Sequence, residues 1–198
     1  MYKRQIEYDT NTIRSNDNMK ILGFTFDGRP SASRHVETTI EKFHARLWTL
    51  RFLRRSGLDE NRLLEVYNSI VRSAVEYCAI VYHSMIPRHL SDGLETLQRR
   101  ALKIVFGWNS DVDTIMAAKG IETLEERRKS AVLRFALKNE EVAKYGGKWF
   151  KKNEEISINL RPGTRNKYKE VKCRTERMKG NPVVYMTSAL NNHYKTEK

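Results

Sequence analysis

Residues 33–57 read SRHVETTIEKFHARLWTLRFLRRSG, a segment whose apolar residues follow a helical period. They recur at spacings of four and three residues, at Val36, Ile40, Phe43, Leu47 and Leu50. Residues three and four apart lie on the same face of an α-helix, so these side chains form one stripe. We therefore expect a helix that begins near the start of this segment, ends near its final glycine and buries one face.

Two more stripes follow the first helix. Asp59 can cap a second helix, whose stripe consists of Leu63, Tyr67, Ile70, Ala74, Tyr77 and Val81. Leu64, Val71 and Cys78 widen this stripe, so the second helix should be the most buried. A third helix begins after Pro87 and ends at Gly107, with its stripe at Leu90, Leu94, Leu97, Ala101 and Ile104. Three such helices joined by short loops predict an antiparallel helical bundle.

Upstream of the bundle the period changes to two. Residues 20–27 read KILGFTFD and place apolar side chains at alternate positions, which predicts a strand that leads into a turn at Gly28. A partner strand near Gln5–Ile13 would complete a short β-hairpin.

Downstream of the bundle two further helices are expected. A short one runs from Asp111 or Asp113 to Ala118 and ends at Gly120. Residues 123–126, TLEE, fit a capping box that opens a helix reaching about Val142.

The pattern divides the chain into three parts. Residues 1–30 form the hairpin, residues 31–145 the helical bundle, and residues 146–198 a tail that begins at Gly146–Gly147. The tail is rich in Lys, Arg, Asn and Glu, so we expect it to be basic, irregular and partly disordered. The predicted fold is mainly α.

The net charge of +13 is concentrated in two parts of the chain. Residues 19–58 hold eight basic and three acidic side chains, residues 146–198 hold thirteen and five, and the remainder is neutral. Such segregation favours two surfaces that face a polyanion. A solvated basic face with a loose tail is the plainer alternative.

The sequence predicts an intracellular protein with no membrane partner, in the nucleus or the cytoplasm. The longest apolar candidate, Tyr77–Ile86, is shorter than the about 18–20 residues of a membrane span. The first residues, MYKR, lack the apolar stretch of a signal peptide. Cys78 and Cys173 lie in unlike surroundings, which favours free or buried thiols over a disulfide.

Catalytic and metal-binding patterns are lacking in the sequence. A nucleotidyl transferase needs clustered carboxylates for two metal ions, yet no two aspartates are adjacent here, and Asp111 and Asp113 are placed as helix caps. Cys78, His83 and His89 lack the close ligand pair and the fourth ligand of a structural zinc site. We therefore expect no catalytic residue, no metal ligand and no cofactor in this chain.

Basic residues on the first helix are the best candidates for contact with nucleic acid. At about 100° per residue, His35, Lys42 and Arg46 share one flank of the apolar stripe, and Glu37 and Glu41 lie on the other flank.

More cations follow at the end of this helix, at Arg51, Arg54 and Arg55. They also suit the helix dipole, so a role in stabilising the helix has nearly equal weight.

Several segments resemble, in order, the C-terminal part of the reverse transcriptases of non-LTR retrotransposons, especially jockey-like LINE elements. Residues 20–27 resemble the KYLGxxxD segment of the primer-grip region. Residues 64–67 (LEVY), 75–77 (VEY) and 94–107 (LETLQRRALKIVFG) resemble the thumb, and residues 120–128 (GIETLEERR) the segment after it. Ser73 and Tyr82 depart from the family, which often has Pro and Trp there.

The resemblance implies part of an RNA-directed DNA polymerase, without its fingers and catalytic palm. The family's magnesium ligands, in a Tyr-x-Asp-Asp turn, are not in this sequence, so the chain alone would be inactive. Its partners would be the backbone of RNA or an RNA–DNA hybrid and a palm and fingers region in a longer product. The contacting residues we predict are Lys20, Lys42, Arg46, Arg51, Arg54 and Arg55.

Two other hypotheses stay open. In the first, the chain is a small basic helical module, derived from a retroelement, that pairs with a partner protein through its apolar stripes. Alternatively, it is a segment of an active enzyme whose gene model is truncated.

Overall fold

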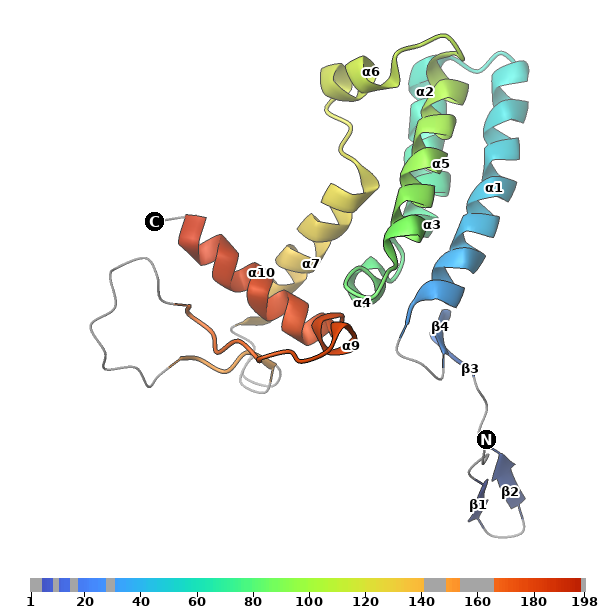
Figure 1. The fold of residues 1–198 in the computed structure, drawn as a ribbon. Helices are drawn as coiled ribbons and strands as arrows, with labels where there is room; N and C mark the ends of the chain where they lie inside the picture. The colour runs from blue at the N-terminus through green and yellow to red at the C-terminus, as the bar shows by residue number, and fades with distance from the viewer. Residues whose placement is uncertain are drawn as a thin grey trace.

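The computed structural model describes residues 5–8, 11–14, 18–27, 31–140, 149–153 and 166–196. The described part is mainly α-helical with short antiparallel hairpins at its N-terminal end, as predicted (Figure 1). The turns expected at Gly28 and at Gly146–Gly147 lie outside the described residues.

The predicted strand over residues 20–27 is divided by a tight turn. β3 (Asn18–Ile21) pairs with β4 (Phe24–Asp27) in a two-residue hairpin. Leu22 and Gly23 both have positive φ, 47° and 83°, which is typical of a type I′ turn. The prediction of one strand is wrong because the alternation of apolar residues continues through the turn.

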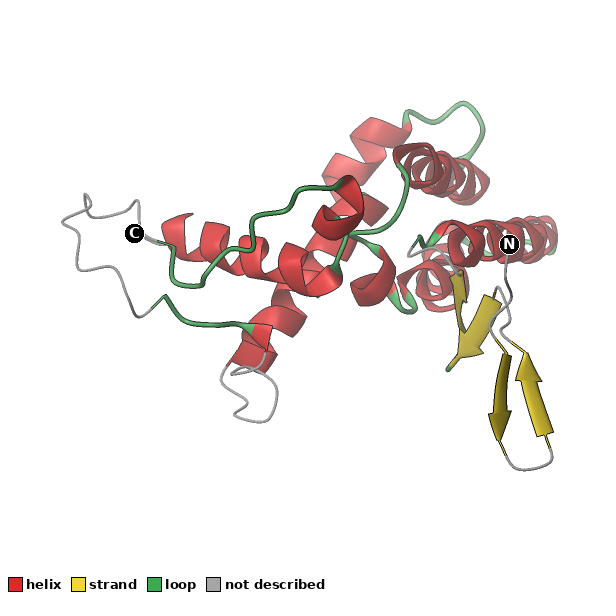
Figure 2. Cartoon of the chain, turned by 60° about the horizontal axis from the view of Figure 1, so that its bottom comes forward, coloured by secondary structure: helices red, strands yellow, loops and turns green. Residues whose placement is uncertain are grey.

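The predicted partner strand also pairs differently. β1 (Gln5–Tyr8) and β2 (Asn11–Arg14) form a separate hairpin with each other and not with the strand at Lys20. Both hairpins lie toward the α1 side of the molecule, away from α10 (Figure 2).

The main core is formed by three helical segments. α1 (Ser33–Arg55) and α5 (Arg88–Phe106) run in the same direction, and residues 60–76 run back beside them (Figure 1). The stripe predicted for α1 is confirmed: four of its five residues are fully buried, and Ile40 packs against the core half-buried. The stripe of α5 is likewise in the core.

The second predicted helix is interrupted. α2 (Glu60–Val66) continues as a π-helix, η1 (Tyr67–Arg72), and then as the short α3 (Ser73–Glu76). The chain breaks at Cys78, where φ is 57°, before α4 (Ala79–Tyr82).

The π-helix shifts the buried face of this segment by one residue. The buried side chains are four apart, at Leu63, Tyr67, Val71, Val75 and Ala79. In an α-helix such a row drifts by about 40° at each step, and the wider π turn compensates for part of this drift. Ile70 and Tyr77, predicted in the stripe, are therefore 45% and 54% exposed, and that part of the prediction is wrong.

Both helices predicted after the bundle are present. α6 (Val112–Lys119) lies between an Asp111 cap and Gly120, whose φ is 61°. α7 (Leu124–Glu140) opens on the predicted capping box: Thr123 Oγ1 accepts from the Glu126 amide, and Glu126 Oε2 accepts from the Thr123 amide, each at 3.1 Å. The expected extension of α7 to Val142 lies outside the described residues.

The prediction of an irregular tail is wrong for its C-terminal part. α9 (Glu176–Lys179) and α10 (Pro182–Thr196) are helical, and α10 packs on α7. The Asn181 side chain accepts from the Val183 amide at 2.9 Å, and proline suits the first position of a helix. The helical spacing of Val183, Met186, Leu190 and Tyr194 was present in the sequence but obscured by polar neighbours.

A second core joins this tail to α7. It consists of Val132, Ala136, Phe150, Tyr168, Met186 and Leu190. Glu140 of α7 strengthens the contact, because its carboxylate accepts from the Tyr194 hydroxyl at 2.6 Å and pairs with Lys167 at 2.5 Å. In the described part of the chain, no helix is both long and apolar enough to cross a membrane.

Candidate nucleic-acid interface

A basic pocket of 390 Å³ lies between the β3–β4 hairpin, α1 and α3. It is lined by Lys20, Gly23, His35, Thr39, Lys42, Arg46, Ser73, Ala74 and Tyr77. Three of the six predicted contact residues, Lys20, Lys42 and Arg46, thus come together from segments more than 20 residues apart. None of the nine lining residues is acidic, so the pocket attracts anions.

The hairpin is held over the pocket by its turn. The Tyr77 hydroxyl donates to the carbonyl oxygen of Leu22. A Cβ on Gly23 would lie 3.3 Å from the Tyr77 ring, so a glycine suits both the positive φ and the close approach. Phe24 anchors the next strand: it is buried and its ring centroid lies 4.3 Å from that of His35. Lys20 is positioned by this docked hairpin.

α1 supplies the other two cations. Lys42 and Arg46 are four residues apart and therefore share one face of the helix. Arg46 Nη1 donates to the carbonyl oxygen of Ile70 at 2.5 Å, which holds the guanidinium against the π-helix. Lys42 is exposed. The face predicted from the helical period is confirmed for these two residues.

His35 lines the same pocket as Lys42 and Arg46, on the flank predicted from the helical period, but unlike them it is buried. Its side chain is buried between Phe24 and Tyr82, with ring centroids at 4.3 and 5.8 Å. Burial, and then the nearby charge of Lys42, lower the pKa of His35 below its ordinary value. The buried face of α1 is wider than the apolar stripe alone, because His35 and Thr39 extend it toward the basic flank.

Arg51, Arg54 and Arg55 lie apart from the pocket. Arg54 Nη1 donates to the carbonyl oxygen of Ile104 in the last turn of α5, so Arg54 joins α1 to α5. Nine residues turn a helix by about two and a half turns, so Arg51 projects opposite Lys42, and Arg55 opposite Arg46. The six predicted residues therefore form two groups.

An exposed aromatic pair accompanies the second group. Trp48 and Phe52 are 64% and 54% exposed, and their rings stack at a centroid distance of 5.6 Å and an angle of 13°. The sequence reasoning missed this pair, although two aromatic residues at a spacing of four on the polar side of a helix could have indicated it.

The other candidate sites have structural explanations. Asp111 caps α6, and Asp113 pairs with Arg99 at 2.6 Å. His83 Nε2 lies 2.9 Å from the Tyr185 hydroxyl, and burial and the charges of Arg128 and Lys129 lower its pKa to about 4. Among the described residues, no group of three or more His, Cys, Asp or Glu could hold a metal ion.

The pocket also contains residues that sequence reasoning did not select as contacts, namely Gly23, Thr39, Ser73, Ala74 and Tyr77. Only the tertiary fold brings them together with the three cations. No protein-family model, no curated protein and no solved structure matches the chain.

Proposed function

We propose that the chain binds the sugar–phosphate backbone of an RNA–DNA hybrid or an RNA duplex through the basic pocket on α1. In this proposal it is the primer-grip and thumb part of a polymerase that resembles the reverse transcriptases of non-LTR retrotransposons. The catalytic aspartates would come from residues outside this sequence. The observation that carries the proposal is the grouping of Lys20, Lys42 and Arg46 around one pocket with no acidic lining residue.

The hydrogen-bond pattern of the pocket favours an anion. The Thr39 hydroxyl donates to the His35 carbonyl at 2.9 Å, and the Ser73 hydroxyl donates to the Ser69 carbonyl at 2.5 Å. Their protons are thus used within their own helical segments. The charged donors that line the pocket are those of the three cations, which suit phosphate oxygens.

Backbone contacts of this kind are independent of sequence and depend on salt, because each neutralised phosphate releases a counterion. The resemblance supports the same reading, since residues 20–27 resemble a primer-grip segment and form the hairpin beside α1. It also explains why cations should line this particular hairpin and helix.

The test is the affinity for a labelled RNA–DNA hybrid measured against salt concentration. We expect log Kd to vary linearly with log salt, and Lys42→Ala with Arg46→Ala to reduce the slope by about one for each lost phosphate contact. A matched control is Arg100→Ala with Lys138→Ala, one arginine and one lysine that are exposed on α5 and α7. A flat plot, or equal behaviour of the two double variants, refutes the proposal.

The stacked pair Trp48–Phe52 favours a second candidate function, a module that pairs with a partner protein or with the missing palm. Exposed aromatic residues beside arginines are typical of protein interfaces. This candidate predicts self-association at low salt that Trp48→Ser and Phe52→Ser abolish, so a strict monomer by sedimentation counts against it.

Sequencing the transcript upstream of Met1 bears on the origin of the chain. An in-frame Tyr-x-Asp-Asp motif would support a segment of an active enzyme, and a nearby stop codon would exclude it.

A further inference from the structure

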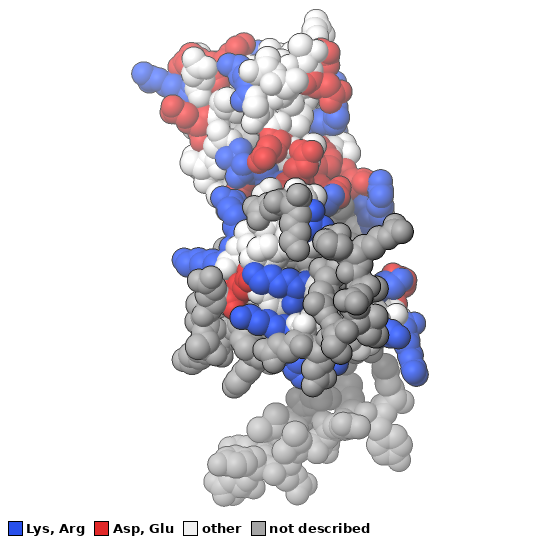
Figure 3. Space-filling view, turned by 90° about the vertical axis from the view of Figure 1, so that its left-hand side faces the viewer, with Lys and Arg blue, Asp and Glu red and all other residues white. Residues whose placement is uncertain are grey.

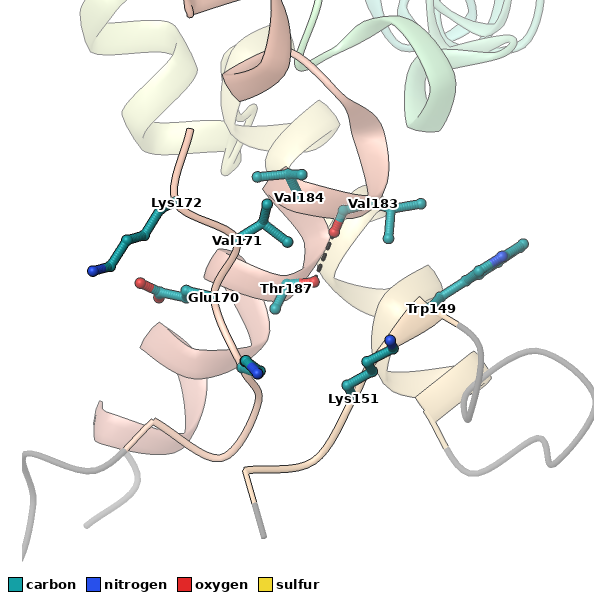
Figure 4. Close-up of a pocket in the computed structure, with 9 residues that line it drawn as sticks. Trp149, Lys151, Glu170, Val171, Lys172, Val183, Val184 and Thr187 are labelled. Carbon is teal, nitrogen blue, oxygen red and sulfur yellow. Dashed lines mark hydrogen bonds between the residues drawn. The ribbon is translucent and has the colours of Figure 1, made fainter. Parts of the chain in front are cut away.

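A second pocket, of 520 Å³, lies at the opposite end of the chain (Figure 4). Residues 149–153 and 166–172, which pair through a short antiparallel bridge, form its sides, and the first turns of α10 form its floor. It is lined by Trp149, Lys151, Lys169, Glu170, Val171, Lys172, Val183, Val184 and Thr187.

The two segments place like charges opposite each other. Lys152 pairs with Tyr168 in an antiparallel bridge, and the Lys169 amide donates to the Lys151 carbonyl at 2.9 Å. Lys151 and Lys169 are therefore cross-strand neighbours on one face, an arrangement that is unfavourable for two cations alone. No carboxylate of the described residues forms an ion pair with either ammonium group.

Apolar residues share this face with the lysines. Trp149 and Val171 line the pocket together with Lys151 and Lys169. Phe150 and Tyr168, which adjoin these residues in the sequence, are buried in the second core. Val171 is 51% exposed, and the pocket thus combines an aromatic ring, exposed aliphatic surface and two cations that no described carboxylate pairs with.

The pocket has a fixed frame. The Asn191 side chain accepts from the Tyr168 amide at 2.9 Å and donates to the Tyr168 carbonyl at 3.0 Å, as a neighbouring strand would. The same amide group donates to Glu170 at 3.2 Å, so the one acidic lining residue is already engaged. The segment that carries Lys169 and Val171 is thereby tied to α10.

We infer that this pocket binds single-stranded nucleic acid, with an unpaired base against Trp149 and the valines and the adjoining phosphates at Lys151 and Lys169. A ligand must offer both a flat apolar part and closely spaced anionic groups, and a nucleotide chain offers both. Figure 3 shows the face that lies on the left-hand side of Figure 1. Lys and Arg outnumber Asp and Glu among the described side chains in its lower part, and most of the acidic side chains lie in its upper part. This site goes beyond the hybrid-binding pocket and does not depend on it.

Quenching of Trp149 fluorescence by an oligodeoxythymidylate of about 12 nucleotides tests the inference. Trp48 and Trp108 are both exposed, so Trp48→Phe and Trp108→Phe leave Trp149 as the single reporter among the three tryptophans. We expect saturable quenching that weakens at high salt, and a loss of affinity of at least about fivefold in Trp149→Ala, followed with a labelled oligonucleotide.

Lys151→Ala with Lys169→Ala should weaken binding and lower its salt dependence, whereas Lys138→Ala should not. Val171→Asp should also weaken binding, because it places a carboxylate beside the lysines. This test does not depend on core packing, since the side chain of Val171 is exposed. Lys42→Ala with Arg46→Ala should leave single-strand binding unchanged, which separates this site from the hybrid pocket.

Three results would overturn the inference. The first is an equal affinity of the labelled oligonucleotide for Lys151→Ala with Lys169→Ala and for the Lys138→Ala control, with both variants shown to be folded by circular dichroism. The second is binding without quenching of Trp149, which would indicate a nonspecific charge contact. The third is equal competition by inorganic polyphosphate or by vesicles with about 30% anionic lipid, because neither offers a base to stack.

Discussion

Truncation of Leu190 to alanine tests whether the C-terminal helix is an integral part of the folded protein. Leu190 is fully buried in the second core, between α10 and α7. Leu190→Ala removes three carbons, which corresponds to about 2.4 kcal/mol of lost burial at about 0.8 kcal/mol per carbon. The cavity left behind adds to this, so we expect a loss of about 3 kcal/mol, within the usual range for such substitutions.

Urea denaturation measures this loss directly, and the melting temperature should fall by about 6–12 °C for a chain of this size. Asn192→Ala, on the exposed side of the same helix, is the matched control. Hydrogen exchange should show weakened protection in α10 before α1 and α5 are affected, because the second core is separate from the main one. A change within about 0.5 kcal/mol of the wild type would refute the packing of α10 described above.

Three further predictions concern pH, the hairpin and a helix cap. The pKa of His83 is lowered from 6.5 to about 4, so between these pH values the unfolded chain binds more protons than the folded one. The free energy of unfolding should therefore fall as the pH drops from 7 to 4.5. Denaturation at the two pH values should show a smaller fall in His83→Gln than in the wild type. Gly23→Ala should lower the free energy of unfolding by about 1 kcal/mol because alanine is strained at this positive φ, and by crowding Tyr77 it should weaken the affinity for the labelled RNA–DNA hybrid. Thr123→Ala removes half of the capping box with Glu126 and should cost about 1 kcal/mol in urea denaturation.

The elements that the sequence predicts well are those whose signals are local. Asp111 and Gly120 bracket α6, and the capping box at Thr123 opens α7, because each cap involves residues within three positions of one another. The stripe of α1 is equally legible, since its buried residues obey the ordinary helical period.

α10 escaped prediction for a physical reason. Its buried residues, Met186 and Leu190, are few and lie among polar neighbours in a basic segment. Their burial depends on α7 and on the segment around Tyr168, which are far away in the sequence. Composition alone therefore indicated an irregular tail.

The candidate site was predictable only in part. Lys42 and Arg46 follow from the period of α1, and Lys20 adjoins them only because the hairpin folds back on Tyr77. Arg54 could not be separated from this group by sequence, since its contact with Ile104 joins two residues that are 50 positions apart in the chain.

The basic pocket has the same structural origin as the error in the prediction of the second helix. A regular α-helix over residues 60–82 would place Tyr77 in the buried stripe, out of reach of the hairpin turn. The π-helix η1 shifts the buried face, so Tyr77 remains exposed and its hydroxyl donates to the Leu22 carbonyl. The same segment presents the Ile70 carbonyl that holds Arg46.

The left-handed conformation of Cys78 immediately follows this contact and costs free energy for a residue other than glycine. Three local irregularities thus adjoin one pocket. Gly23 of the turn lines it, the π-helix directly precedes the lining residue Ser73, and Cys78 directly follows the lining residue Tyr77. Irregular backbone that the surrounding structure maintains is often found where a protein binds or acts. The irregular helix is therefore a second reason, besides charge, to expect a ligand at this pocket.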